Sequence, residues 1–336
     1  MSDFSIRSPL VGTVVAISVA PGDVVSKGTD LLVLESMKME YPVLSSESCQ
    51  ISAIHVVVGQ TVSEGQVLIE YIAVVGESSA REVIPNGSGV REDLAARRLP
   101  LAQIHQRMEQ TEPALDAHTF LTRDEMNVIA EVKRSSPSKG SLAAITDPAS
   151  LAEQYQEAGA AAVSVLTERR RFGGSLEDLD AVRKRVTIPV LRKDFMVDEY
   201  QFLEARAHGA DIVLLIVAAL SKSQLRDFYD LATELGMASL IEVHTAQELE
   251  SAMDIEPRII GVNSRNLKTL DVDSAAFADL IPRIPSDVIR VAESGIATRS
   301  HVEFAQNAGA TAILVGETLV KSGDPISAMQ ELLGRR

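Results

Sequence analysis

Charged and amide side chains stand at the ends of short apolar runs, at positions where a buried strand favours apolar residues. They are Glu131, Lys193, Glu242, Asn263 and Glu293. Burying one charge without a partner costs several kcal/mol, so these groups must meet one another, water or a substrate. Neighbouring lysine and glutamate groups can tune each other toward acid–base chemistry near neutral pH. The alternative is that these residues only form ion pairs with one another and have no catalytic role. This alternative accounts for any single residue, but not for all of them at the same end of successive strands.

The elements that must position these side chains are eight apolar runs, each followed by a segment with helical spacing. The runs span residues 128–132, 162–166, 189–191, 212–217, 239–243, 259–262, 288–292 and 312–315. Near-continuous apolar strands that alternate with helices predict a parallel sheet. Eight such units predict an α/β fold of the closed (β/α)₈ TIM-barrel type, whose active site lies at the C-terminal ends of the strands.

Two glycines follow the last two predicted strands. Gly295 comes after the seventh strand and Gly316 after the eighth. Barrels often bind phosphate with these two loops, where backbone N–H groups face the anion. Glycines also serve as simple turn residues, so the prediction of a phosphate site depends on their place in the barrel.

The N-terminal residues 1–75 follow a different pattern, with valine-rich alternation of period two and no helical segment. An internal repeat with an offset of 37 residues matches Gly22 to Gly59 and Val25 to Val62. Each half reads as strand, glycine turn, strand, which predicts a small all-β sandwich with pseudo-twofold symmetry. The seam between the halves, residues 35–40, is expected to be a hairpin turn with Lys38 at its exposed tip.

A stretch of small and polar residues with proline and glycine separates the two patterns. Its composition is typical of a linker. The predicted organisation is therefore a β domain over residues 1–75, a flexible linker over 76–89 and a barrel over 90–336. Residues 90–110, at the start of the barrel region, have helical spacing and many charges.

The composition excludes several classes of protein. The net charge of −15 leaves no basic footprint for nucleic acid. A single cysteine, Cys49, allows no disulfide framework and favours a reducing compartment. No signal peptide is recognisable, and the most apolar run, residues 212–220, is about half of a membrane span. We therefore expect a cytoplasmic protein that is not bound to membranes.

The barrel region resembles the indole-3-glycerol phosphate synthases. The resemblance covers about residues 90–336, and its motifs are Glu131-Val-Lys133-Arg-Ser-Ser136-Pro-Ser, Leu191-Arg-Lys193-Asp-Phe195, Leu240-Ile-Glu242-Val, Gly261-Val-Asn263-Ser-Arg265-Asn-Leu and Ala292-Glu293-Ser-Gly295. It implies a decarboxylating and dehydrating ring closure in tryptophan biosynthesis. The substrate is 1-(2-carboxyphenylamino)-1-deoxyribulose 5-phosphate, and the products are indole-3-glycerol phosphate, carbon dioxide and water.

The same resemblance assigns roles to the polar residues. Lys193 is implied as the general acid of ring closure, and Glu242 as an acid–base group. Glu131 and Lys133 are implied in binding and dehydration, and Asn263 as a catalytic residue that orients the substrate. The remaining expected substrate contacts are Ser136 and Glu293, then Arg265, Ser294, Gly295 and Gly316 around the phosphate, and Phe172, Phe195 and Leu214 around the anthranilate ring. This reaction requires no cofactor.

The N-terminal segment resembles biotinyl carrier domains. The motifs are Arg7-Ser-Pro-Leu-Val-Gly12-Thr, Pro21-Gly22-Asp and Glu35-Ser-Met37-Lys38-Met39. Methionines on both sides of the lysine favour biotin over lipoate. The resemblance implies biotin covalently bound to Lys38, with a biotin protein ligase and a biotin carboxylase as partners. One departure is Cys49, which the repeat aligns with Gly12 at a site where the family usually has glycine.

Two other functions compete with the synthase. The chain could be a biotin carboxyl carrier whose barrel is a scaffold or docking domain, and loss of the catalytic lysine or glutamates would have favoured that hypothesis. It could also be a related phosphate-binding barrel such as phosphoribosylanthranilate isomerase, which would need a different acid–base pair. We expect no metal site, because His244 and His301 lack metal-ligand spacing. His244 is interpreted as a structural residue at a strand end, and His301 as an exposed helix residue.

Overall fold

The computed structural model describes residues 3–25, 29–36, 39–45, 49–73, 88–136, 140–141, 145–266 and 271–335. The chain divides into two compact units, residues 1–83 and 84–336, and each is described by itself. In the described part of the chain, no helix combines the length and the hydropathy that a membrane crossing requires.

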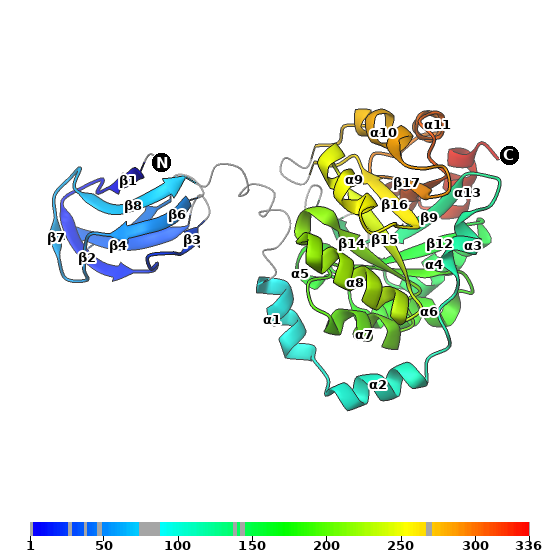
Figure 1. Ribbon diagram of the computed structural model, residues 1–336, viewed down its shortest axis with the longest axis horizontal. Coiled ribbons are helices and arrows are strands. Elements are labelled where there is room, and N and C mark those ends of the chain that lie inside the picture. The colour runs from blue at the N-terminus through cyan, green and yellow to red at the C-terminus, as the bar shows by residue number, and fades with distance from the viewer. Residues whose placement is uncertain are drawn as a thin grey trace. The chain divides into compact units, whose positions relative to one another are not determined.

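The N-terminal unit consists of two four-stranded antiparallel sheets (Figure 1). Their strand orders are β1-β8-β6-β3 and β5-β4-β2-β7. The strands are β1 (Asp3–Arg7), β2 (Gly12–Ile17), β3 (Val24–Val25), β4 (Asp30–Ser36), β5 (Met39–Leu44), β6 (Cys49–Ile54), β7 (Thr61–Val62) and β8 (Val67–Ala73). The core between them is aliphatic and includes Val14, Leu32, Leu34, Ile51 and Ile69. This confirms the predicted all-β sandwich.

The internal repeat is visible in the strand boundaries. β2, β3 and β4 recur 37 residues later as β6, β7 and β8, with identical lengths. Exchanging the halves converts the order of one sheet into the order of the other, which is the predicted pseudo-twofold relation. Cys49 is fully buried in this core, at the position that corresponds to Gly12.

The seam between the two repeats is an antiparallel pair. β4 pairs with β5, and the last partners in register are Ser36 and Met39. Met37 and Lys38 connect these partners and lie outside the described residues. The predicted exposed position of Lys38 is therefore not described by the structure.

The C-terminal unit contains a closed barrel of eight parallel strands (Figure 1). The strand order is β12-β13-β14-β15-β16-β17-β18-β9. The strands are β9 (Asn127–Val132), β12 (Ala162–Leu166), β13 (Val190–Lys193), β14 (Ile212–Ile216), β15 (Ala238–Val243), β16 (Ile259–Asn263), β17 (Ile289–Glu293) and β18 (Ala312–Val315). Two short strands, β10 (Ser135–Ser136) and β11 (Gly140–Ser141), pair in the loop after β9. The predicted TIM-type barrel is confirmed.

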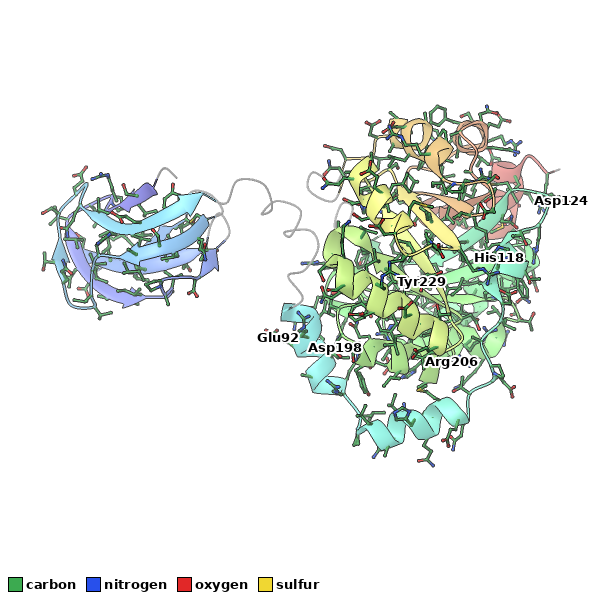
Figure 2. All side chains as sticks on the ribbon, in the orientation of Figure 1. Glu92, His118, Asp124, Asp198, Arg206 and Tyr229 are labelled. Atoms are coloured by element: carbon green, nitrogen blue, oxygen red, sulfur yellow. The ribbon has the colours of Figure 1, made fainter. Side chains whose placement is uncertain are left out.

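Helices cover the outside of the barrel (Figure 1). They are α3 (Ala117–Leu121), α4 (Pro148–Glu157), α5 (Arg169–Phe172), α6 (Leu176–Arg185), α7 (Tyr200–Ala207), α8 (Lys222–Glu234), α9 (Ala246–Met253), α10 (Ala275–Leu280), α11 (Arg299–Asn307), α12 (Glu317–Lys321) and α13 (Pro325–Leu333), with 3₁₀ turns η1 (Val217–Ala219) and η2 (Ile281–Arg283). Figure 2 labels Arg206 of α7 and Tyr229 of α8 in this helical layer.

Alternation along the strands produces two separate cores. One set of side chains fills the barrel interior and includes Ile129, Leu191, Leu214, Leu240 and Val291. The other set lies between the strands and the helices and includes Val128, Val190, Val213, Ile241 and Ala292. Because successive strand residues face opposite sides, every barrel strand has to be apolar on both faces. This explains why the sequence shows near-continuous apolar runs.

The strands differ from the predicted runs by up to two residues at either end. The run 189–191 continues as β13 through Arg192 and Lys193, and the run 288–292 continues as β17 through Glu293. The backbone pairing persists because charged side chains there find partners on both faces of the sheet. Lys193 and Glu293 are therefore strand residues and not loop residues.

The helical segment predicted over residues 90–110 is two helices. These are α1 (Ser88–Arg97) and α2 (Leu101–Glu109). Pro100 stands at the start of α2, and proline has no N–H to continue the first helix. α1 begins two residues inside the predicted linker, and the exact domain limits of 75, 89 and 90 stay a prediction.

Candidate active site

A lysine ammonium lies between two glutamate carboxylates at the C-terminal end of the barrel. Lys193 Nζ is 2.7 Å from Glu242 Oε2 and 2.9 Å from Glu293 Oε2. The three residues come from β13, β15 and β17, so alternate strands of the barrel bring them together. Both carboxylates are almost fully buried, and the lysine side chain is 13% exposed. Lys193 is therefore the most solvent-exposed of these three side chains.

The carboxylate of Glu242 has two further contacts. Asn263 Nδ2 donates to Glu242 Oε1 over 3.1 Å, and His244 Nε2 lies 3.3 Å from the same oxygen. The Glu293 carboxylate differs, because its Oε1 is buried without a hydrogen-bond partner among the described residues. Of the two glutamates on Lys193, only Glu242 is held at both oxygens.

The charges in this cluster make the two glutamates unequal. Burial opposes ionisation of Glu242, but Lys193 and His244 outweigh it and hold the pKa of Glu242 well below its usual range. Burial raises the pKa of Glu293 to about 7, and the neighbouring carboxylates of Glu242 and Glu131 add to the rise against the attraction of Lys193. Burial also opposes the charge on Lys193, but the surrounding carboxylates raise its pKa above the usual range. Lys193 is thus an ammonium that can bring a proton to a substrate.

A second lysine–glutamate pair lies at the end of β9. Lys133 Nζ is 2.6 Å from Glu131 Oε1, and the Glu131 side chain is 5% exposed. Gly316 follows β18 and lies close to this carboxylate, since a methyl group on Gly316 would approach Glu131 Oε1 to 2.8 Å. A side chain at position 316 would thus displace Glu131.

The loop after β17 has a special backbone. Ser294 and Gly295 both have a positive φ, 67° and 73°, and Ser294 is one of two non-glycine residues of the described chain with this geometry. Such strain in a non-glycine residue often marks a functional site. Ser264 Oγ donates to the carbonyl oxygens of Glu293 and Ser294 over 3.2 Å, which fixes the turn. The backbone N–H of Arg265 donates to Asn263 Oδ1 over 3.0 Å.

Aromatic side chains form an apolar wall on another side of the mouth. The rings of Phe172 and Phe195 lie 6.4 Å apart between centroids. Phe195 packs against the inward core that contains Leu214. The guanidinium of Arg171 lies 5.8 Å from the centre of the Phe195 ring. Ser136 belongs to β10, and its side chain lies outside what the structure describes.

Three contributors were missed by the sequence analysis. His244 was interpreted as structural, yet it contacts both Glu242 and Glu248. Its spacing of two residues from Glu242 is a signal for a shared strand face. Gly261 makes room for Glu293, because a methyl group there would overlap Glu293 Oε1. Arg192 is a fully buried cation on the outer face of β13.

The described residues contain no group of three or more His, Cys, Asp and Glu side chains that could hold a metal ion. His244 is paired with carboxylates, and His301 lies exposed on α11, as expected for it.

Comparison with known proteins assigns both parts of the chain. Residues 88–332 match the family described as indole-3-glycerol phosphate synthase, and residues 5–71 match the family described as biotin-requiring enzyme. Indole-3-glycerol phosphate synthases from Kineococcus radiotolerans and an Arthrobacter species are 58% and 55% identical to this chain. Each alignment covers 73% of this chain and 92% of the relative.

Solved structures resemble the barrel at the level of the fold. A 3-hexulose-6-phosphate synthase from Salmonella typhimurium has a TM-score of 0.50 and 13% sequence identity, over 62% of this chain and 97% of its own. The match to the synthase family spans the barrel, the lysine–glutamate cluster and the strained turn after β17, and the chain belongs to the indole-3-glycerol phosphate synthase family.

Proposed function

We propose that this chain closes an indole ring. It converts 1-(2-carboxyphenylamino)-1-deoxyribulose 5-phosphate to indole-3-glycerol phosphate, carbon dioxide and water. The observation that supports this function most directly is the ammonium of Lys193 between the buried carboxylates of Glu242 and Glu293. Ring closure needs a proton donor of this kind at the sugar carbonyl.

In the first step, the aromatic carbon that bears the carboxylate bonds to the ribulose carbonyl carbon. The carbonyl oxygen becomes negative as this bond forms, and Lys193 donates a proton to it. Carbon dioxide then leaves, and the electron pair of the broken bond returns to the ring. Lys193 is suited to this role because its neighbours keep it protonated while its side chain stays partly accessible.

In the second step, the new hydroxyl group leaves as water. It needs a proton from an acid, and the ring system must lose a proton to a base. Lys133 and Glu131 form the pair that we assign to this dehydration, and Glu242 acts as an acid–base group in the reaction. The carboxylate of Glu242 is ionised in the resting site, so it is in the form that can accept a proton.

The remaining site residues hold the substrate. The phosphate lies at Arg265, Ser294, Gly295 and Gly316, with Lys133 nearby. The anthranilate ring lies against Phe172, Phe195 and Leu214, and Ser136, Asn263 and Glu293 bind and orient the substrate. The left-handed turn at residues 294–295 supports the phosphate assignment, because it lies in one of the two loops that commonly bind phosphate in such barrels.

Turnover of the purified chain tests this function. We expect wild-type protein to produce indole-3-glycerol phosphate and an equal amount of carbon dioxide. Glu242→Gln keeps the shape of the side chain and removes its charge, so it should lose most of the activity while staying folded. Wild-type protein without turnover would overturn the assignment and favour a carrier whose barrel is a scaffold.

We further propose that Lys38 carries covalent biotin. The support is the match of residues 5–71 to biotin-requiring enzymes and the Met-Lys-Met motif between β4 and β5. The strands on either side of Lys38 pair in register up to Ser36 and Met39, which fits a lysine presented at a hairpin. Bound biotin would supply a carrier for an activated carboxyl group. The partners are a biotin protein ligase and a biotin carboxylase, in a cytoplasmic setting.

The intact mass of protein from its native host and a streptavidin blot test the modification. Biotin and lipoate differ in mass, so the mass also decides between them. Lys38→Arg should abolish the streptavidin signal, and Lys27→Arg, at the other lysine of residues 1–75, should keep it. A signal that survives Lys38→Arg would contradict this proposal without affecting the synthase.

A further inference from the structure

His244 is a buried histidine that connects the lysine–glutamate cluster to helix α9. It follows β15 directly, and its side chain is 9% exposed. On one side, Nε2 lies 3.3 Å from Glu242 Oε1, an ion-pair contact without hydrogen-bond geometry. On the other side, Nδ1 lies 3.1 Å from Glu248 Oε2. An imidazole with a carboxylate at each nitrogen is stabilised in its doubly protonated, cationic form.

Glu248 fixes this imidazole in place. Its Oε2 also accepts the backbone N–H of His244 over 2.8 Å, so ring and backbone bind the same oxygen. The backbone N–H of Glu248 donates to Thr245 Oγ1 at the start of α9. The loop after β15 and the first turn of α9 therefore form one rigid support for the imidazole.

The two glutamates on Lys193 differ in the cations that face them. Glu242 is faced by Lys193 from β13, by His244 after its own strand and by the Asn263 amide from β16. Glu293 is faced by Lys193 and by two other carboxylates, those of Glu242 and Glu131. His244 is thus a second cation beside Glu242, and it contributes to the difference between the surroundings of the two glutamates.

We propose, on the basis of the ring-closing function above, that His244 is a positioning residue. Its imidazolium holds Glu242 as an oriented carboxylate and leaves Glu293 as the glutamate that takes up a proton. The protonation of the groups agrees with this geometry. The flanking carboxylates raise the pKa of His244 to about 9 against the opposing effect of burial, and the pKa of Glu242 lies well below its usual range.

The pH profile of turnover tests the proposal. His244→Asn keeps a polar side chain and removes the cation, so the pKa of Glu242 should rise. The step of the acidic limb of kcat that reports Glu242, which lies below the step of Glu293 near pH 7, should then move up by about one pH unit, within the range typical of a lost neighbouring charge. KM should change little, because His244 acts through Glu242. Glu248→Gln should move the limb in the same direction by less. His105→Asn, at an exposed site on α2, is the matched control and should leave the profile unchanged.

A purely structural His244 would lower kcat at every pH without moving the limb, and that result would overturn the proposal. Histidine NMR titration provides a readout that does not need turnover. The His244 ring should titrate well above the ordinary range in wild-type protein and fall back toward it in Glu242→Gln. A ring that titrates normally in both proteins overturns the positioning role. Absence of turnover in wild-type protein would instead overturn the ring-closing function and leave the titration to decide the contact.

Discussion

Arg192 and Lys193 are neighbouring cations on β13 that face opposite sides of the barrel wall. Arg192 faces outward and is completely buried. It donates to Thr167, to the carbonyl of Gln201 and to the carboxylates of Asp194 and Glu204. Lys193 faces inward, is partly exposed and contacts Glu242 and Glu293.

The two networks differ in how completely their members are paired. In the outer network each acid has a second partner: Glu204 pairs with Arg97 of α1, and Asp194 also accepts from Thr167 and from the backbone N–H of Phe195. In the inner network Glu293 Oε1 and His244 Nε2 are left without a hydrogen bond among the described residues. A closed network stabilises a structure, whereas an unpaired buried oxygen marks a group available to a substrate.

The largest expected effect is on catalysis. Lys193→Ala removes the proton donor, so kcat should fall by roughly 10²–10⁴-fold, the usual share of a general acid. Stability should change much less, because Glu293 can take up a proton when its cation is lost. Steady-state kinetics and urea unfolding of the same samples measure the two effects. Turnover within a few-fold of wild type would remove Lys193 from the mechanism.

The outer network should respond in the opposite way. Arg192→Met leaves the buried carboxylate of Asp194 without its cation and Glu204 with Arg97 alone, so the free energy of unfolding should fall by about 3–5 kcal/mol. The folded fraction should retain far more activity than Lys193→Ala. Lys222→Met is the control, since Lys222 pairs with Asp254 at the surface and its loss should cost less than about 1 kcal/mol. Equal stability losses in Arg192→Met and Lys193→Ala would contradict the distinction between the fully paired outer network and the incompletely paired inner network.

The sequence predicted the inner network better than the outer one. Lys193, Glu242 and Glu293 could be found because charges at the ends of apolar strands are rare and their shared location follows from the barrel. The strand boundaries were less predictable, because β13 and β17 continue through charged residues whose partners are distant in sequence. The repeat of the N-terminal unit was found because glycine turns and valines recur at one offset, which fixed its strand pattern.

Contacts that depend on exact side-chain position could not be predicted. Arg192 pairs with Glu204, which also pairs with Arg97, and these two partners belong to helices that the sequence pattern does not place against β13. Gly261 has to be a glycine because the Glu293 carboxylate of another strand lies against it. No local sequence pattern indicates this contact. His244 could have been assigned to the site from its spacing to Glu242, but its second partner on α9 required the packing.

Gly261→Ala tests whether the inner network depends on the precise position of the Glu293 carboxylate. The added methyl group would overlap Glu293 Oε1 and approach Leu240 Cδ1 to 3.2 Å, so the glutamate must move away from Lys193. A displacement of about 1 Å at such a site can lower turnover by up to about 100-fold. Stability should change less than in Arg192→Met. A crystal structure and kcat of the variant check this, and unchanged kcat with a shifted Glu293 would show that its position is unimportant.

The two networks should also differ in how the free energy of unfolding depends on pH. His244 has its pKa raised from 6.5 to about 9 in the folded chain, so its contribution to stability is complete below pH 6.5 and is lost as the pH rises through 9. The stability difference between wild type and His244→Asn should therefore shrink over this window, by about 3 kcal/mol for a pKa shift of this size. The loss caused by Arg192→Met should stay constant, because a guanidinium remains charged throughout. Urea unfolding at pH 6 and pH 9.5 measures both, and a pH-independent His244→Asn effect would show that folding does not raise the pKa of the His244 imidazole.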